Sequence, residues 1–373
     1  MIIGCVKEIK NNEYRVGLTP QAVREYCRAG HQVIIQSGCG VGSSFSDDDY
    51  QDAGARVLES PQAVWKQSQM IVKVKEPIAS EYQYLRPGLI LYTYLHLAAD
   101  ENLTAALLKN KVIAVAYETI VDSDGSLPCL KPMSQVAGRL AVLEGAKYLL
   151  KPYGGIGLLI GGVPGVQKAN CLVLGAGVVG ENATGYLVGL DAKVTVLDIN
   201  NNRLEYLEHL YHNKITTLYN NEQNLIQALK EADLIISSVL LPGSKAPKLI
   251  KKAYYPFMKK GSVIVDVAID QGGTTEVSRP TTHQDPVFTY EGIIHYCVAN
   301  MPGAVSLTAT QALNNATLKY GLLIAASGLK SPSKACSALK KGLNTYLGQL
   351  TNQAVAEALN LAWVEVDELP SDN

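Results

Sequence analysis

The sequence lacks the features of several specialised structural classes. Its 373 residues contain seven cysteines but no CxxC pair; the cysteines lie at positions 5, 27, 39, 129, 171, 297 and 336. An odd count without metal-type spacing argues against a disulfide framework or a zinc site. Lys and Arg number 33, and Asp and Glu number 34. With that balance the chain has no basic field to attract nucleic acid or an anionic membrane.

Long apolar runs and a targeting segment are also missing. The closest approach to a membrane-spanning run, GGIGLLIGGVPGV (154–166), is short and interrupted by Pro164. The first ten residues, MIIGCVKEIK, carry charges where a signal peptide needs apolar residues. We therefore expect a soluble, cytoplasmic protein.

The composition and length predict a globular protein of two domains. Apolar residues make up 47% of the chain and charged residues 18%, enough to bury a large core. In the first third, apolar β-branched runs alternate with amphipathic stretches such as 20–30, where Thr19 fits a helix cap and Pro20 the first turn. This alternation predicts a parallel sheet covered by helices. The candidate strands are 2–6, 32–36, 70–74, 89–94 and 112–117.

A second series of strands and helices follows a long predicted helix at about 133–151. Its candidate strands are 171–175, 193–198, 234–239, 262–267 and 293–298. The tail from about 305 has helical patterns and no clear strand. We expect it to return to the first domain. The predicted fold class is α/β, with a central Rossmann domain (130–304) and a Rossmann-like domain formed by both chain ends (1–129 and 305–373).

A glycine-rich turn in the second half carries the signature of a dinucleotide site. Gly175-Ala-Gly177-Val178-Val179-Gly180 follows an apolar strand and opens a helical pattern. Gly175 permits a tight turn, Gly177 allows close approach of a diphosphate, and Gly180 lets the helix pack on the strand. The next strand ends in Asp198, which is placed to bind ribose hydroxyls and to repel a 2′-phosphate, and so favours NAD over NADP. Arg203 is a nearby cation that weakens this preference.

A second glycine-rich segment does not share this context. Gly38-Cys-Gly40-Val-Gly42 also follows a strand, but a polar loop comes next and the third glycine is not at the required spacing. We interpret it as a turn. His209 and His212 have helical spacing without a third ligand, so we predict a solvated helix face and no metal site.

Four polar residues follow predicted strands, at the sheet edge where open parallel sheets bind ligands. They are Arg15, Lys75, His96 and Asp270. Each taken alone is typical of a surface charge, a loop residue or a turn cap. Their shared placement beside a dinucleotide fold predicts a common cleft between the two halves. Lys73 competes with Lys75, because the two share one face of a strand and periodicity cannot choose between them.

Over essentially its whole length the chain resembles the bacterial alanine dehydrogenases. The matching segments are 7–20, 74–77, 94–98, 132–138, 175–180, 241–247, 266–273 and 299–304. The resemblance implies NAD-dependent, reversible oxidation of L-alanine to pyruvate and ammonia by a homohexamer. It implies that Arg15 and Lys75 bind the substrate carboxylate, that His96 and Asp270 are the catalytic pair, and that Leu130 and Met133 shape a pocket for the methyl group.

The same resemblance implies a set of cofactor contacts beyond the glycine loop. Asn220 departs from the family pattern, which has serine near the adenine, and this puts one contact in doubt. The residues implied to contact NAD are Ser134, Asp198, Arg203, Val239, Leu240, Val267, Ala268, Ile269 and Asp270, with Asn300 and Met301 near the nicotinamide.

The residue types fit this chemistry. A histidine can move protons as the amine is oxidised and water adds to the iminium, while a carboxylate orients the water or stabilises the developing cation. Two cations fix the substrate carboxylate, and NAD accepts the hydride. Two alternatives stay open. One is a transhydrogenase-like NAD(H)-binding subunit without amino-acid turnover, and the other is a non-enzymatic NAD-binding protein.

Overall fold

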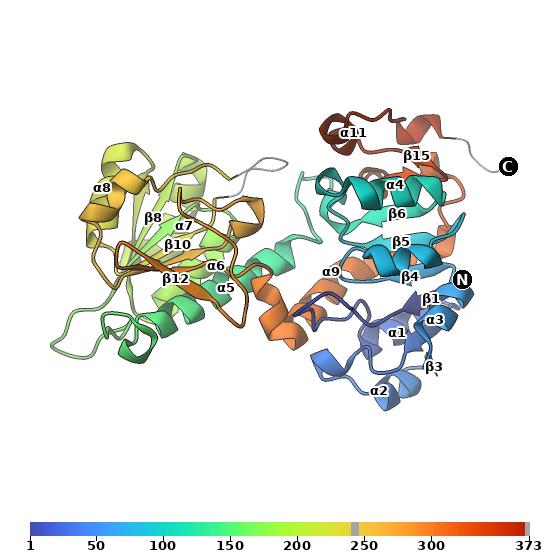
Figure 1. Cartoon of the computed structure of the whole chain (residues 1–373), viewed down its shortest axis with the longest axis horizontal. Helices are drawn as coiled ribbons and strands as arrows, with labels where there is room; N and C mark the ends of the chain where they lie inside the picture. Colours follow the sequence, from blue (N-terminus) through green and yellow to red (C-terminus); the bar gives the residue numbers. More distant parts are fainter. Residues whose placement is uncertain (240–245, 370–373) are drawn as a thin grey trace. The chain divides into compact units, whose positions relative to one another are not determined.

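The computed structural model describes residues 1–239 and 246–369 and divides into two compact units (Figure 1). Unit 1 contains residues 1–133 and the tail from Val305 on, and unit 2 contains residues 134–304. Helix α5 (Lys131–Tyr148) carries the chain from unit 1 into unit 2, and the short helix η9 (Met301–Val305) lies at the return. The two units are each described by themselves below.

An eight-stranded sheet forms the centre of unit 1. Its order is β15-β14-β6-β5-β4-β1-β2-β3, and the six strands of the first third, β1 to β6, are parallel to one another. The bounds are β1 Ile2–Cys5, β2 Gln32–Gln36, β3 Arg56–Leu58, β4 Met70–Val72, β5 Ile90–Thr93, β6 Ile113–Ala116, β14 Leu343–Tyr346 and β15 Gln349–Leu350.

Helices cover both faces of this sheet, which explains why its strands are continuously apolar. Ile3, Val72 and Tyr92 point to a core shared with α1 and α9, while Ile71 and Leu91 point to the opposite core with α3, α4 and α11. The bounds are α1 Pro20–Arg28, α2 Asp47–Asp52, α3 Pro61–Gln67, α4 Glu101–Lys109, α9 Ser306–Ser327, α10 Ser337–Gly342 and α11 Gln353–Leu359.

The tail returns to unit 1, as predicted, but its secondary structure differs from the prediction. The long helix α9 packs into the unit 1 core, and β14 pairs antiparallel with β6. The expectation that the tail is helical throughout is therefore wrong for β14 and β15. These strands are short and lie at the sheet edge, so they carry too few residues for a clear alternating pattern.

Unit 2 is built on a seven-stranded sheet of order β12-β13-β11-β10-β7-β8-β9, in which only β12 is antiparallel. The strand order reverses between β7 and β10, and this switch point is where doubly wound sheets bind ligands. The bounds are β7 Asn170–Leu174, β8 Lys193–Asp198, β9 Ile215–Tyr219, β10 Leu234–Ser237, β11 Val263–Asp266, β12 Val287–Tyr290 and β13 Ile293–Tyr296.

Helices α6 (Val178–Gly189), α7 (Asn201–Tyr211) and α8 (Glu222–Glu231) pack against this sheet. The predicted fold class, α/β with two Rossmann-like parts and the first formed from both chain ends, is confirmed. In residues 1–239 and 246–369 we find no helix with the length and apolar character to cross a bilayer.

Candidate functional site

Three of the predicted residues follow three neighbouring strands of unit 1. Strands β1, β4 and β5 lie side by side, and Arg15, Lys75 and His96 come after them. Because all three strands are parallel, their carboxyl ends lie at one edge of the sheet. The structure therefore gathers these three residues at the edge that the sequence predicts.

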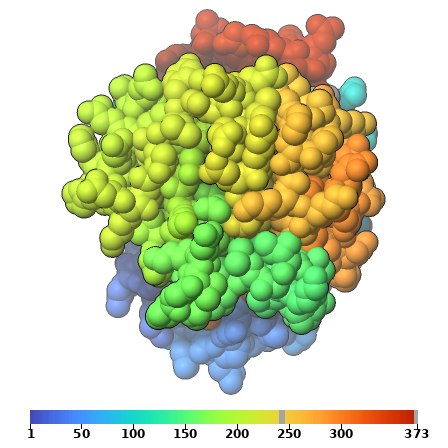
Figure 2. All heavy atoms as spheres, turned by 90° about the vertical axis from the view of Figure 1, so that its left-hand side faces the viewer, coloured from blue at the N-terminus to red at the C-terminus, as the bar shows by residue number. Residues whose placement is uncertain are grey.

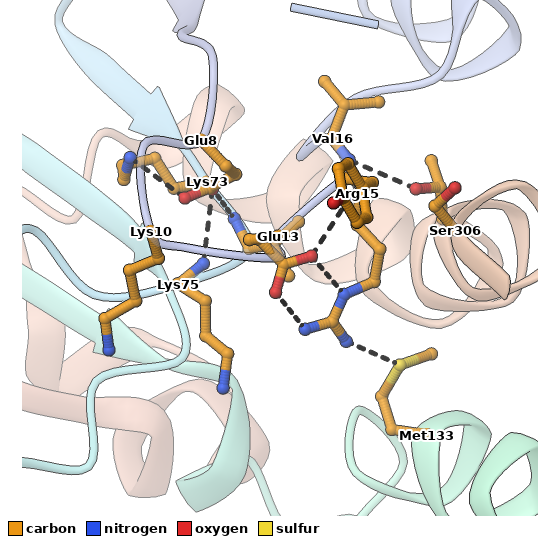
Figure 3. A network of polar contacts seen from close by, with 12 residues as sticks. Glu8, Lys10, Glu13, Arg15, Val16, Lys73, Lys75, Met133 and Ser306 are labelled. Atoms are coloured by element: carbon orange, nitrogen blue, oxygen red, sulfur yellow. Dashed lines mark hydrogen bonds and ion pairs between the residues drawn. The ribbon is translucent and has the colours of Figure 1, made fainter. Parts of the chain in front are cut away.

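Arg15 is a buried cation held by the carboxylate of Glu13 (Figure 3). Its Nε donates to Glu13 Oε1 at 2.7 Å and its Nη2 to Glu13 Oε2 at 2.5 Å, a bidentate pairing that fixes the guanidinium plane. Burial alone would lower the pKa of Arg15, but the hydrogen bonds and charge of Glu13 outweigh it and raise that pKa. Arg15 therefore stays charged and oriented.

Met133 lies against the same guanidinium. Nη1 of Arg15 is 3.1 Å from the Met133 sulfur, and Leu130 packs at the margin of the unit 1 core. Met133, one of the two side chains predicted to shape a small apolar pocket, is thus placed beside the cation predicted to bind a carboxylate.

The structure separates Lys73 from Lys75. Lys73 is fully buried, with its Nζ 3.2 Å from Glu8 Oε2 and 3.0 Å from Glu81 Oε1. Burial acts to lower the pKa of Lys73, but the two carboxylates outweigh it and raise that pKa. Lys75 is half-buried, and its ammonium end points away from this cluster in Figure 3. The two lysines, which periodicity could not tell apart, thus differ in their surroundings, with Lys73 enclosed by carboxylates and Lys75 partly exposed.

His96 sits directly after β5, where its backbone is left-handed with φ +52° and ψ +39°. Its side chain is exposed, and its ring stacks on Tyr94 with centroids 6.1 Å apart and planes 10° apart. The carboxylate of Glu118 accepts hydrogen bonds from the backbone of His96 and Leu95. The imidazole is thus presented to solvent from a fixed turn.

In unit 2 the glycine loop has the geometry that a diphosphate requires. Gly175 has φ +98°, and a Cβ at Gly180 would lie 1.8 Å from the Gly175 carbonyl oxygen, so only glycine fits there. Among the described residues, no atom lies within 4 Å of a Cβ built on Gly177, so their side chains leave space over that backbone. Helix α6 begins at Val178, and no side chain caps it at Gly177. An uncapped helix N-terminus beside open space fits a dinucleotide.

Asp198 and Arg203 flank this loop. Asp198 Oδ2 accepts from the Ala176 amide at 2.5 Å, and the Asn220 amide donates to the Asp198 carbonyl at 2.9 Å. The Arg203 guanidinium donates from Nε to the Ala176 carbonyl at 2.9 Å and from Nη2 to Glu181 Oε2 at 2.6 Å. The positive charge of Arg203 is therefore already paired with Glu181.

Asp270 is an exposed residue on the short helix η8 (Ile269–Gln271), after β11. The buried Asp266 fixes the surrounding loop, because its carboxylate accepts from the amides of Ala268 at 3.2 Å and Thr274 at 2.7 Å. Val267, whose amide bonds to the Ser237 carbonyl, joins this loop to the end of β10.

The remaining predicted cofactor residues are dispersed over unit 2. A Cβ built on Gly175 would lie 3.2 Å from Val239, which places Val239 beside the glycine loop, whereas Leu240 lies outside the described residues. Ser134 and Val179 are half-buried on α5 and α6. Asn300 has φ +58°, and Met301 is buried. The part of the chain that the structure describes contains no cluster of three His, Cys, Asp or Glu residues that could hold a metal ion.

Sequence reasoning missed the carboxylates that support these groups: Glu8, Glu13, Glu118, Glu181 and Asp266. Only Glu118 gave a usable signal, because it follows the predicted strand 112–117 just as the other candidates follow theirs. For the others, nothing in the spacing indicates which charged group each would meet.

The two lysines give a stability prediction. Lys73→Met leaves Glu8 and Glu81 buried without their cation, so we expect a loss of about 3–5 kcal/mol in the free energy of unfolding. The matched change Lys75→Met, at a half-buried position, should alter it by less than about 1 kcal/mol. Urea unfolding followed by circular dichroism measures the free energy of unfolding of both variants. Equal losses would contradict the view that Lys73, and not Lys75, neutralises the buried carboxylates.

Comparisons with known proteins agree with this geometry. Family profiles described as the N-terminal and C-terminal domains of alanine dehydrogenase/PNT match residues 4–137 and 141–353. The chain is 50% identical over 369 residues to proteins called alanine dehydrogenase from Staphylococcus haemolyticus and Methanococcus maripaludis, covering 99% of this chain and of each relative.

Solved structures give the same result. One described as L-alanine dehydrogenase superposes with a TM-score of 0.94 at 48% identity, covering 96% of this chain and 99% of that one. A transhydrogenase from Sinorhizobium meliloti superposes with a TM-score of 0.81 at 24% identity, covering 95% of this chain and 100% of that one, and shares the fold. The chain is a member of the alanine dehydrogenase/PNT family of enzymes.

Proposed function

We propose that this chain catalyses the NAD-dependent, reversible oxidative deamination of L-alanine to pyruvate and ammonia. One observation carries the proposal: three neighbouring strand ends in unit 1 present two cations and an imidazole, and unit 2 carries a dinucleotide loop. The names of relatives that share half of the sequence over the full length support the choice of alanine.

Arg15 and Lys75 bind the carboxylate of the substrate. Glu13 holds the Arg15 guanidinium in one plane, so less entropy is lost when a carboxylate arrives. Lys75 adds a second positive charge from the neighbouring strand end. Met133 and Leu130 form the apolar surface for the methyl group. Larger side chains are disfavoured only because they lack space, and in apolar pockets such discrimination is worth roughly 1–3 kcal/mol per methylene.

His96 and Asp270 carry the proton chemistry at the α-carbon. When bound, NAD accepts the hydride from that carbon. His96 takes a proton from the substrate ammonium and passes it to solvent. It then takes a proton from the water that adds to the iminium and returns it to the nitrogen as ammonia leaves. Asp270 orients that water and stabilises the positive charge on the substrate nitrogen. Both side chains are exposed in their own units, so each can reach a bound molecule.

The residues present fit NAD. The first turn of α6 and the glycine loop hold the diphosphate, and Asp198 accepts from the adenosine ribose hydroxyls. Because Glu181 pairs with Arg203, little positive charge remains to attract a 2′-phosphate. This pairing supports NAD over NADP, although Arg203 lies nearby. The other contacts proposed from the family are Ser134, Val178, Val179, Asn220, Val239, Leu240, residues 267–270, Asn300 and Met301.

We also propose a cytoplasmic location and a homohexameric assembly. All seven cysteines are free thiols, as is usual in a reducing compartment. Unit 2 exposes large apolar side chains along α5, the connector 150–167 and α6, an amount that typically marks a protein interface. They are Leu143, Tyr153, Leu159, Val163, Val166, Tyr186 and Leu190.

These apolar side chains belong to one region of unit 2. The Arg139 guanidinium on α5 lies 5.6 Å from the centre of the Tyr186 ring on α6. A Cβ on Gly161 would lie 2.4 Å from the carbonyl oxygen of Leu190, so the connector meets the end of α6. In Figure 2 the green atoms, which include the connector, form a continuous band across this face.

The activity is tested by His96→Ala and Asp270→Ala. We expect each to lower kcat for L-alanine by at least about 100-fold, because proton transfer contributes on the order of 10²–10⁴. NADH should still bind to both variants, since the glycine loop is intact; Asp270→Ala, which also removes one proposed cofactor contact, should weaken that binding far less than it lowers kcat. NADH formation at 340 nm with a panel of L-amino acids measures turnover, and a fluorescence titration with NADH measures binding. NADH binding without amino-acid turnover by the parent protein would indicate a transhydrogenase-like subunit instead.

Cofactor choice is tested at Asp198 and Glu181. Asp198→Ala should narrow the ratio of kcat/KM for NAD over NADP by roughly tenfold, since it removes repulsion of the 2′-phosphate. Adding Glu181→Gln should narrow this ratio further, because Arg203 then loses its ion-pair partner and can attract the 2′-phosphate. Glu205→Gln, an exposed acid on α7, is the matched control and should leave the ratio unchanged. Equal use of both cofactors by the parent protein would refute the assignment.

The assembly is tested by placing charged residues among the exposed apolar side chains of the connector. Leu159→Asp with Val166→Asp should reduce the mass measured by analytical ultracentrifugation, because charges are costly in a desolvated interface. Val41→Asp places the same charge on an equally exposed apolar residue of unit 1 and should leave the mass unchanged. A parent protein that sediments as a monomer would contradict the hexamer.

A further inference from the structure

Glu118 contacts the turn that carries His96. It lies on the short helix η4 (Tyr117–Thr119), directly after β6, and β6 pairs with β5. Its Oε1 accepts from the His96 amide at 2.6 Å and from the Leu95 amide at 3.1 Å, while Oε2 lies 3.3 Å from the Leu95 amide. One carboxylate thus binds two successive backbone amides past the end of β5.

The conformation of His96 needs such support. A residue with a side chain pays free energy for the left-handed region, and it stays there only when its surroundings hold it. The His96 backbone, with φ +52°, is in this region. Glu118 binds the amides of Leu95 and His96, one on each side of the Leu95 α-carbon, and so fixes the direction in which the imidazole leaves the chain. The Tyr94 ring stacks parallel to the imidazole and so also restricts its orientation.

Glu118 itself is held in place by the returning tail. The neighbouring Thr119 hydroxyl accepts from Asn344 Nδ2 at 2.7 Å and donates to the carbonyl of Gly342. Tyr117 packs edge-on against Tyr94, with ring centroids 5.0 Å apart. The segment that carries Glu118 is therefore fixed to β14 on one side and to the aromatic residues under His96 on the other.

We propose that Glu118 is the positioning residue for His96: by binding the Leu95 and His96 amides it holds the imidazole in the orientation in which it transfers protons. The inference rests on the proposed role of His96 in alanine oxidation. It requires no contact between Glu118 and the substrate, and it predicts an effect on turnover and not on binding.

The test is a set of variants at position 118 in the full-length protein. Glu118→Ala should lower kcat on the order of 100-fold, the cost of displacing a reacting group by about 1 Å. KM for L-alanine and Kd for NADH should stay within about twofold, because Arg15, Lys75 and the glycine loop are untouched. Glu118→Gln should lose less, since its carbonyl oxygen can still accept from both amides.

Hydrogen–deuterium exchange gives a readout that does not depend on activity. In Glu118→Ala, the peptide covering residues 94–99 should exchange faster, while in Glu118→Gln it should remain close to the parent. Asp49→Asn is the matched control: the Asp49 carboxylate also accepts from a backbone amide, that of Ser46, at 2.7 Å. That variant should change neither kcat nor exchange at 94–99, even if it lowers the melting temperature.

The outcomes separate this inference from the proposed function. If the parent protein does not oxidise alanine, or if His96→Ala keeps its turnover, the proposed function fails. If His96→Ala is inactive while Glu118→Ala keeps kcat within about twofold and exchange at 94–99 is unchanged, only the role of Glu118 fails. A raised KM with unchanged kcat would also overturn it, because Glu118 would then act on the substrate. Should Glu118→Ala not fold, Glu118→Asp takes its place: its side chain is one methylene shorter and withdraws the carboxylate from the two amides, so kcat and exchange at 94–99 are judged by the same criteria.

Discussion

The functional edges of both sheets depend on one recurring interaction, a carboxylate that accepts hydrogen bonds from backbone amides just past the end of a parallel strand. Beyond its last ladder bond a strand leaves amides that must find other partners. A charged acceptor satisfies them with bonds that are shorter and stronger than neutral ones, and so fixes the loop. The four carboxylates that do this are Glu8 at the loop of Lys75, Glu118 at that of His96, Asp198 at the glycine loop and Asp266 at the loop of Asp270.

This arrangement explains how a loop can hold a candidate functional side chain in place as firmly as a strand would. A side chain for substrate or cofactor must be held within a fraction of an ångström, yet it must lie outside the regular structure to be reached. In unit 1 the supporting carboxylates come from the neighbouring strand connections, so the parallel sheet supplies both the functional group and its support. The two units use the same device although their sheets end differently, one with the antiparallel pair β14 and β15 and the other with β12.

The sequence was sufficient for the central strands and for the glycine loop, because strands buried on both faces give continuous apolar runs and the loop has fixed spacing. It did not reveal β3, β9, β12, β14 or β15, which are edge strands or lie next to an edge and are short or partly polar, as in ITTLY (215–219). The candidate residues themselves were visible as polar groups after strands. Their supporting carboxylates were not, because a pairing such as Glu181 with Arg203 depends on which loops the fold brings together.

The buried Lys73 is understood in the same terms. A lysine without exposure is costly, and a fold is often just as stable when a whole buried ion-pair cluster is replaced by apolar residues. Burial raises the pKa of Glu8, and the Lys73 ammonium opposes that rise without cancelling it. The ammonium also holds Glu8 in the position where its Oε1 accepts from the amides of Val74 at 2.6 Å and Lys75 at 3.3 Å. The buried Lys73 thereby helps to keep in place the loop that carries Lys75. The two lysines lie only two positions apart, and their roles are distinct but connected.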